Sequence, residues 1–298
     1  MQVGVVGLGS MGMGVANALL RGGHGVSGFD VRAEARAALV SAGGQAHATP
    51  AELGRDARIV IILVVNAAQV DDVLFGPSGL VGTMARGGII LQSATVPPDY
   101  PESLGERLAA HGLRLIDAPV SGGASGAQAG KLTIMASGDP SAFEDCAEVL
   151  ASIAGKVYRL GDRPGQGSQI KLVNQLLAGV HIAVAAEAMA LAIRLGADPR
   201  TAFEVLSNSA GASWMFQNRM PHVLDGDYAP RSAVNIFVKD LGIVLETAKK
   251  NLFPTPLAAI AHQLFTMAAA HGHGLEDDAA VIKVFQALTG IALPEKST

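Results

Sequence analysis

Apolar positions in the first half of the chain form short runs separated by glycine turns and by helix-length segments. The runs predict strands, and the segments between them, with apolar residues every three or four positions, predict helices. We expect strands at Val3–Val6, Gly25–Phe29, Ile59–Val64, Gly88–Leu91 and Leu113–Ile116, and helices at Met13–Arg21, Ala33–Ser41, Ala68–Leu74 and Asp99–Ala110. This alternation is typical of a parallel sheet with helices on both faces.

The sheet is expected to continue through a strand at Gly130–Ala136, a helix at Pro140–Ala151 and a last strand at Lys156–Leu160. Beyond Leu195 no strand pattern recurs. Gly, Asp and Pro separate helices at Pro199–Ser207, Ser213–Val223, Ser232–Leu252, Pro256–His271 and Ala279–Thr289. We therefore predict an α/β dinucleotide-binding domain with a doubly wound sheet over residues 1–163. A long helix and an all-helical domain follow over residues 164–298.

The long helix, Gly165–Leu195, connects the two predicted domains. It contains no proline, and its apolar residues surround most of the helix, which indicates burial. Lys171, Asn174 and Gln175 lie near its start at spacings that place them on one face. Buried polar side chains need polar partners, and we expect the partner here to be the substrate.

Composition narrows the function classes. Of the 298 residues, 49% are hydrophobic and 16% charged, which excludes an intrinsically disordered chain. The net charge of −4 makes nucleic acid an unexpected partner. The single cysteine, the absence of a predicted signal peptide and the short apolar runs of the first half favour a soluble cytoplasmic protein with no membrane partner.

The turn after the first predicted strand is a G-x-G-x-x-G sequence that opens a helix, and Asp30 follows at the end of the second strand. This context matches the dinucleotide-binding fingerprint, with the helix N-terminus facing the pyrophosphate. Asp30 would bind the ribose hydroxyls and repel a 2′-phosphate, so NAD is favoured over NADP, although Arg32 could accommodate the phosphate. The predicted cofactor-binding residues here are Gly7, Leu8, Gly9, Ser10, Met11, Gly12, Asp30, Val31 and Arg32.

Two further loops follow predicted strands, at the sheet edge where ligands bind in α/β folds. Val64, Val65 and Asn66 belong to the first loop, and Thr95 belongs to the second. Asn66 and Thr95 could bind the nicotinamide side of the cofactor. A helix cap is an equally good interpretation of each.

After the fifth strand, Ser121, Gly122 and Gly123 can turn consecutive backbone N–H groups toward one point and hold a carboxylate. Asp117 is expected to orient this loop. The eight histidines show no metal-ligand spacing, and no metal site is predicted.

Four blocks give the chain a resemblance to the β-hydroxyacid dehydrogenase family: GLGSMG at Gly7–Gly12, DAPVSGG at Asp117–Gly123, GQGSQIKLVNQ at Gly165–Gln175 and FVKDL at Phe237–Leu241. The family includes 3-hydroxyisobutyrate dehydrogenase, tartronate semialdehyde reductase and L-threonate dehydrogenase. Many relatives carry asparagine where this chain has Gln175. Gln175 and the stretches His181–Leu191 and Trp214–Tyr228 resemble the L-threonate branch.

The resemblance implies an NAD-dependent oxidoreductase that acts on the CH–OH group of a small hydroxy acid, L-threonate or a similar sugar acid. It implies Lys171 as the proton-transfer residue, Ser121, Gly122, Gly123, Asn174 and Gln175 at the substrate, and Lys239 at the cofactor. A 3-hydroxyisobutyrate dehydrogenase or a tartronate semialdehyde reductase is the alternative, and an imine reductase or a non-catalytic NAD-binding protein is disfavoured by Lys171. A long apolar helix needs partners, so we expect a homodimer or homotetramer.

Overall fold

The computed structural model describes residues 1–296, which divide into two compact units, residues 1–171 and residues 172–296. The division falls inside one continuous helix, α9 (Gln166–Arg194). The predicted domain boundary between residues 163 and 164 lies just before this helix and stays a prediction.

The first unit is built on one sheet whose strands run in the order β3-β2-β1-β4-β5-β6-β8-β7, with β9 beside β8. Strands β1 to β6 are parallel, β8 is antiparallel to β6 and β7, and β9 is parallel to β8. The strands are β1 (Gln2–Val6), β2 (Gly25–Phe29), β3 (Gln45–Ala46), β4 (Ile59–Ile62), β5 (Ile89–Gln92), β6 (Arg114–Asp117), β7 (Val120–Ser121), β8 (Leu132–Gly138) and β9 (Ala154–Arg159). The predicted doubly wound α/β fold is confirmed.

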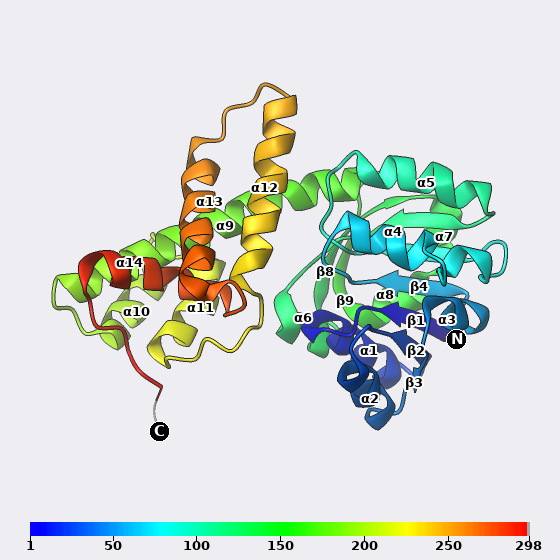
Figure 1. Ribbon diagram of the computed structural model, residues 1–298, viewed down its shortest axis with the longest axis horizontal. Coiled ribbons are helices and arrows are strands. Elements are labelled where there is room, and N and C mark those ends of the chain that lie inside the picture. Colours follow the sequence, from blue (N-terminus) through cyan, green and yellow to red (C-terminus); the bar gives the residue numbers. More distant parts are fainter. Residues whose placement is uncertain (297–298) are drawn as a thin grey trace. The chain divides into compact units, whose positions relative to one another are not determined.

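Successive strand residues point to opposite faces, so each face has its own core. In β4, Ile59 and Ile61 join the core on one face, and Val60 and Ile62 join the core on the other. Figure 1 shows α1 and α2 on one side of the sheet, with α4 and α5 on the other. The helices of this unit are α1 (Ser10–Arg21), α2 (Ala33–Ser41), α3 (Pro50–Asp56), α4 (Ala67–Phe75), α5 (Tyr100–Ala110), α6 (Gly123–Ala129), α7 (Pro140–Asp145) and α8 (Ala147–Ile153).

Several predicted elements need correction. The expected strand at Ile59–Val64 ends at Ile62, and the expected helix at Pro140–Ala151 is two helices that meet at Cys146, where the backbone leaves helical geometry. Helix α3 was missed, although Thr49 caps it and proline occupies its first turn. Helix α6 was missed because its glycine-rich sequence has low helix propensity, and packing against α1 stabilises it instead.

The second unit is helical, and it consists of the main part of α9 with α10 (Pro199–Ser207), α11 (Trp214–Leu224), α12 (Val234–Lys250), α13 (Pro256–Ala268) and α14 (Ile282–Thr289). Figure 1 shows α12 and α13 as an antiparallel pair, in which Phe237 and Phe265 stack with ring centroids 5.1 Å apart. The one glycine inside α9, Gly179, lies where α12 crosses. A Cβ at this position would lie 2.9 Å from the Leu241 side chain, so the close approach of the two helices requires glycine.

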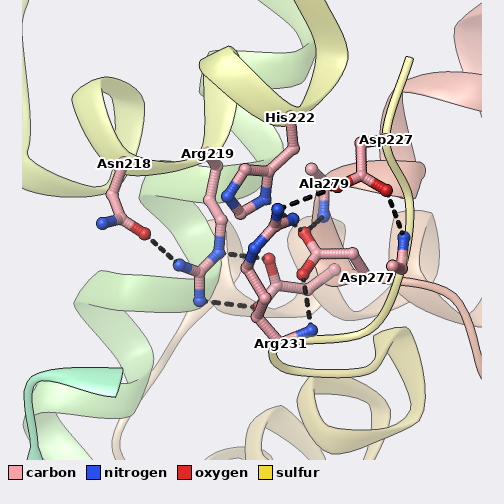
Figure 2. A network of polar contacts seen from close by, with 9 residues as sticks. Asn218, Arg219, His222, Asp227, Arg231, Asp277 and Ala279 are labelled. Carbon is pink, nitrogen blue, oxygen red and sulfur yellow. Dashed lines mark hydrogen bonds and ion pairs between the residues drawn. The ribbon is translucent and has the colours of Figure 1, made fainter. Parts of the chain in front are cut away.

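Buried charges stabilise this helical unit where α11 packs against residues 277 and 278, which follow α13 (Figure 2). The guanidinium of Arg219 binds both carboxylate oxygens of Asp278, at 2.5 and 3.0 Å. Beside this pair, Asp277 bonds His222 at 2.8 Å and accepts the backbone N–H of Arg231 at 3.0 Å. Both aspartates are fully buried, so these contacts replace the water that they lose on folding.

The sequence predicts a helix that is apolar around most of its circumference and buried; α9 is apolar, and within one chain it is buried only in part. Val173, Leu177, Val184, Leu191 and Leu195 are each at least half exposed. Leu195 follows the last residue of α9, and the other four, with separations of four, seven and seven residues, lie along one straight stripe of the helix, which we call the α9 stripe. Among residues 1–296, α9 alone is long and apolar enough to cross a membrane, and 44% of that segment is buried within the structure.

Candidate active site

The turn between β1 and α1 has the geometry that a pyrophosphate requires. Gly7 has a φ of +87°, and its N–H donates to the carbonyl of Phe29 at 2.9 Å. A Cβ on Gly12 would lie 1.7 Å from the Gly7 carbonyl oxygen, so only glycine allows the turn to close. A Cβ on Gly9, by contrast, would meet no atom within 4 Å. Open space therefore borders the turn where α1 begins, at Ser10 and Met11.

The carboxylate of Asp30 lies directly against this turn. Its Oδ2 accepts the N–H of Leu8 at 2.8 Å, and its Oδ1 accepts the N–H and the Nε of Arg32 at 2.9 and 3.1 Å. Burial would raise the pKa of Asp30, but these hydrogen bonds outweigh it and hold the pKa below its usual value. Asp30 is therefore ionised at neutral pH, which agrees with recognition of ribose hydroxyls. Val31, between the two, is exposed.

A cavity of about 530 Å³ continues from Asp30 and is lined by Gly7, Val31 and Val64, among others. Val65 and Asn66, which follow Val64, lead into α4. The Asn66 side chain caps this helix by accepting the N–H of Gln69 at 2.9 Å, and the N–H of Val65 donates to the Gln69 side chain at 2.8 Å. Thr95 follows β5, which lies beside β4, so it is at the same edge of the sheet.

The predicted carboxylate-binding loop lies between β7 and α6. Ser121 ends β7, and Gly122 and Gly123 have φ values of +128° and +64°. Two consecutive left-handed residues are a backbone conformation that glycine adopts without strain, and it is what turns successive N–H groups to one side. A Cβ on Gly123 would meet no atom within 4 Å, so space borders this loop as well.

Asp117, at the end of β6, fixes the start of α9. Its carboxylate accepts the N–H groups of Gly165 and Ser168 at 3.0 and 2.8 Å and the Ser168 hydroxyl at 2.7 Å. Burial raises the pKa of Asp117 to about 6, against the lowering effect of these hydrogen bonds. A Cβ on Gly167 would lie 2.3 Å from the carbonyl oxygen of Met135, so the helix begins pressed against the sheet.

Lys171 lies three residues after Ser168, one turn along α9, and is buried with 8% of its surface exposed. The contacts of Asp117 with the first turn therefore set where this amine stands relative to the sheet. The sequence predicts that Asp117 orients its own loop, and the structure shows that Asp117 also holds the start of α9.

In the second unit the remaining predicted residues form one hydrogen-bonded chain. The Asn174 amide donates to the Gln175 side-chain oxygen at 3.0 Å, and the Gln175 amide donates to Asp240 at 2.6 Å. The other carboxylate oxygen of Asp240 lies 2.5 Å from the Lys239 amine. Asp240 is almost fully buried and was not singled out from the sequence, although it lies within the FVKDL block.

Several other polar and aromatic residues of α11 contribute to packing and to the ion-pair network. Arg219, Phe216 and Asn218 belong to the second unit's core and charge network, whereas Trp214 is exposed. Within residues 1–296, no group of three or more His, Cys, Asp or Glu side chains could hold a metal ion.

Comparison with known proteins gives a consistent result over the whole chain. Residues 2–161 match the NAD-binding domain of 6-phosphogluconate dehydrogenase, and residues 165–285 match the NAD-binding domain of NADP-dependent 3-hydroxyisobutyrate dehydrogenase. An L-threonate dehydrogenase of Cupriavidus necator is 56% identical over 99% of both chains, and one of Escherichia coli K12 is 50% identical over 98% of this chain and 96% of that protein. The chain belongs to the β-hydroxyacid dehydrogenase family.

A solved structure supports the same assignment. The crystal structure of a 3-hydroxyisobutyrate dehydrogenase from Salmonella typhimurium is 50% identical, with a TM-score of 0.91 over 95% of this chain and 99% of that one. The chain is thus an oxidoreductase of the hydroxyacid dehydrogenase type with an NAD-binding domain, as the sequence predicted. The turn geometry, the ionised Asp30 and the adjoining cavity fit a nicotinamide dinucleotide, which supplies the hydride acceptor when bound.

Proposed function

We propose that this dehydrogenase oxidises L-threonate, or a closely similar polar hydroxy acid, with NAD. The observation that carries the proposal is the group of five L-threonate dehydrogenases that are 47–56% identical to this chain over nearly its full length. A 3-hydroxyisobutyrate dehydrogenase of Pseudomonas aeruginosa is more distant, at 34% identity, so that activity is the second candidate.

Lys171 takes the proton of the substrate hydroxyl, and a bound nicotinamide cofactor would supply the hydride acceptor. A general base must approach the reacting group closely and be neutral when it accepts the proton. Burial of the amine and the positive charge of an oxidised nicotinamide both favour the neutral form. In the reverse direction the same amine returns the proton.

The substrate carboxylate is held by the backbone N–H groups of Ser121, Gly122 and Gly123, and Asn174 binds a substrate hydroxyl. Gln175 uses its amide NH₂ to bind Asp240 and its oxygen to bind Asn174, so it fixes the orientation of Asn174. Lys239, which forms an ion pair with Asp240, binds the cofactor. Asp30 selects NAD over NADP, because Arg32 is already bound to its carboxylate and a 2′-phosphate would face that negative charge.

The protein works as a homodimer or homotetramer in the cytoplasm. The α9 stripe supports self-association, because a straight row of apolar side chains at helical spacing is what two antiparallel or parallel helices bury against each other. A second copy of the same helix offers a matching row. Neither a membrane nor a nucleic acid is needed as a partner.

The test is turnover with a panel of hydroxy acids, namely L-threonate, D-glycerate, tartronate semialdehyde (assayed as reduction) and 3-hydroxyisobutyrate, each with NAD and with NADP. We expect L-threonate with NAD to give the highest kcat/KM. A preference for 3-hydroxyisobutyrate would replace the substrate assignment, and no turnover of any of the four would overturn it. Lys171→Ala, measured in parallel, should retain NAD binding and lose about a hundredfold or more in turnover. Near-normal turnover of this variant would contradict the role of Lys171.

A further inference from the structure

The cavity beside Asp30 has apolar walls and one polar side. Val31, Pro50, Val64 and Val73 supply apolar surface, and Gln69 and Asp72 supply polar groups. Asp30 fixes the ribose at one end of this cavity, so the planar base attached to that ribose extends into it. Apolar side chains bind the two faces of a base without regard to its identity, and only hydrogen-bonding groups at its edge can distinguish one base from another.

Gln69 and Asp72 lie three residues apart on α4, which places them on the same face of the helix. The side-chain oxygen of Gln69 accepts the N–H of Val65, so the amide is oriented and its NH₂ group is the part left for a ligand. Asp72 differs from its neighbour. Asp71 binds the Arg107 guanidinium at 2.7 Å and the Tyr100 hydroxyl at 3.0 Å, whereas no residue of the described chain donates to the Asp72 carboxylate.

We propose that Asp72 and Gln69 read the base of the cofactor. The Asp72 carboxylate accepts a hydrogen bond from the exocyclic amino group of adenine, and the Gln69 amide donates to N7 on the same edge, which is an acceptor in adenine and hypoxanthine alike. The proposal rests on the dinucleotide site described above. A carboxylate accepts hydrogen bonds and cannot donate them, so a base with a carbonyl oxygen in place of the amino group meets repulsion instead of a bond.

The consequence is selectivity against the hypoxanthine analogue of NAD, in which a carbonyl replaces the amino group and the adjacent ring nitrogen N1 carries a hydrogen, while the nicotinamide end is unchanged. A hydrogen bond to a charged acceptor at a partly exposed site corresponds to about a tenfold difference in affinity. Because the base lies far from the reacting carbon, the two dinucleotides should differ in dissociation constant more than in kcat.

The experiment is isothermal titration of the unmodified protein and of Asp72→Asn with NAD and with nicotinamide hypoxanthine dinucleotide. We expect the unmodified protein to bind NAD about tenfold more tightly, and Asp72→Asn to bring the ratio to about one or to reverse it, since an amide can donate to the carbonyl. Asp71→Asn is the matched control on the adjacent residue, and it should keep the ratio of the unmodified protein.

Each outcome decides one question. The proposed hydrogen bond between Asp72 and the base would be overturned by either of two results. One is equal affinity of the unmodified protein for the two dinucleotides, and the other is an unchanged ratio of the two dissociation constants in Asp72→Asn. A Gln69→Ala variant that retains full affinity for NAD would remove Gln69 from the proposal. Failure of the unmodified protein to bind either dinucleotide would instead overturn the cofactor assignment on which the proposal depends.

Discussion

The Asp117 carboxylate and Ser168 are joined by two hydrogen bonds, one from the serine hydroxyl at 2.7 Å and one from its backbone N–H at 2.8 Å. Both residues are buried. The pair connects the end of β6 to the first turn of α9, and Lys171 follows one turn later. The end of a strand thereby positions the amine that we propose as the proton-transfer group.

Removal of the Ser168 hydroxyl should loosen this connection. We expect Ser168→Ala to lower the free energy of unfolding by about 1–3 kcal/mol, because a buried carboxylate loses a donor. It should also lower kcat and leave the dissociation constant of NAD unchanged. Thermal unfolding, steady-state kinetics and titration with NAD measure the three quantities. Ser141→Ala is the control, since that hydroxyl also bonds an aspartate, Asp139, but at an exposed site. An unaltered kcat in Ser168→Ala would show that the pair only stabilises the fold.

The raised pKa of Asp117 gives a pH dependence of definite sign. The ordinary aspartate pKa is 3.8 and that of Asp117 is about 6, so between these values the folded protein holds a proton that the unfolded chain has released. The contribution of Asp117 to the free energy of unfolding therefore falls as pH rises from about 4 to about 6, by about 2–3 kcal/mol in all. Urea unfolding of the unmodified protein and of Asp117→Asn across this pH range measures how this contribution to the free energy of unfolding changes. A difference between the two proteins that does not change with pH would contradict the prediction.

Two glycines of the turn should respond differently to the same substitution. Gly9→Ala places a methyl group in the open space beside the turn, so we expect an unchanged melting temperature and weaker binding of NAD. Gly12→Ala places the methyl group on the Gly7 carbonyl, so both the melting temperature and NAD binding should fall. Calorimetry of each variant with and without NAD separates the two effects. Undiminished NAD binding in Gly9→Ala would mean that the pyrophosphate does not approach this residue.

The Arg219–Asp278 pair should matter more to stability than an exposed pair of the same type. Arg219→Ala leaves a fully buried carboxylate without its cation, and the expected loss is about 3–5 kcal/mol. Arg200→Ala, which breaks an exposed pair with Asp225, should cost less than about 1 kcal/mol. Chemical unfolding of the two variants provides the comparison, and equal losses would refute the structural role of the buried pair.

The α9 stripe should control the oligomeric state. Leu177→Asp combined with Leu191→Asp places two charges on it, and we expect the molar mass from light scattering to fall to that of one chain. Val205→Asp introduces the same charge at an exposed apolar residue of α10, away from the stripe, and should leave the mass unchanged. A monomeric mass for the unmodified protein would contradict the proposed assembly.

The sequence by itself determined the elements whose residues interact along the chain. The alternation of apolar runs and helical segments located most strands and the long helix within a few residues, because side-chain period and local turns are properties of neighbouring residues. The glycine turn and Asp30 were predicted for the same reason, since the turn needs glycine at fixed positions and the strand end places the carboxylate. The four motif blocks, which are short and local, indicate the family by themselves.

Only the tertiary structure decided which distant residues meet. Asp117 and Ser168 are far apart in the sequence, as are Gln175 and Asp240, and no local pattern indicates either contact. The helix at Gly123–Ala129 exists because it packs on α1, which its composition alone does not predict. Asp71 and Asp72 are adjacent and chemically identical, yet one is bound to Arg107 and the other faces the cavity. The different surroundings of Asp71 and Asp72 are set by how the chain packs, because packing decides which side chains are buried and which partners they meet.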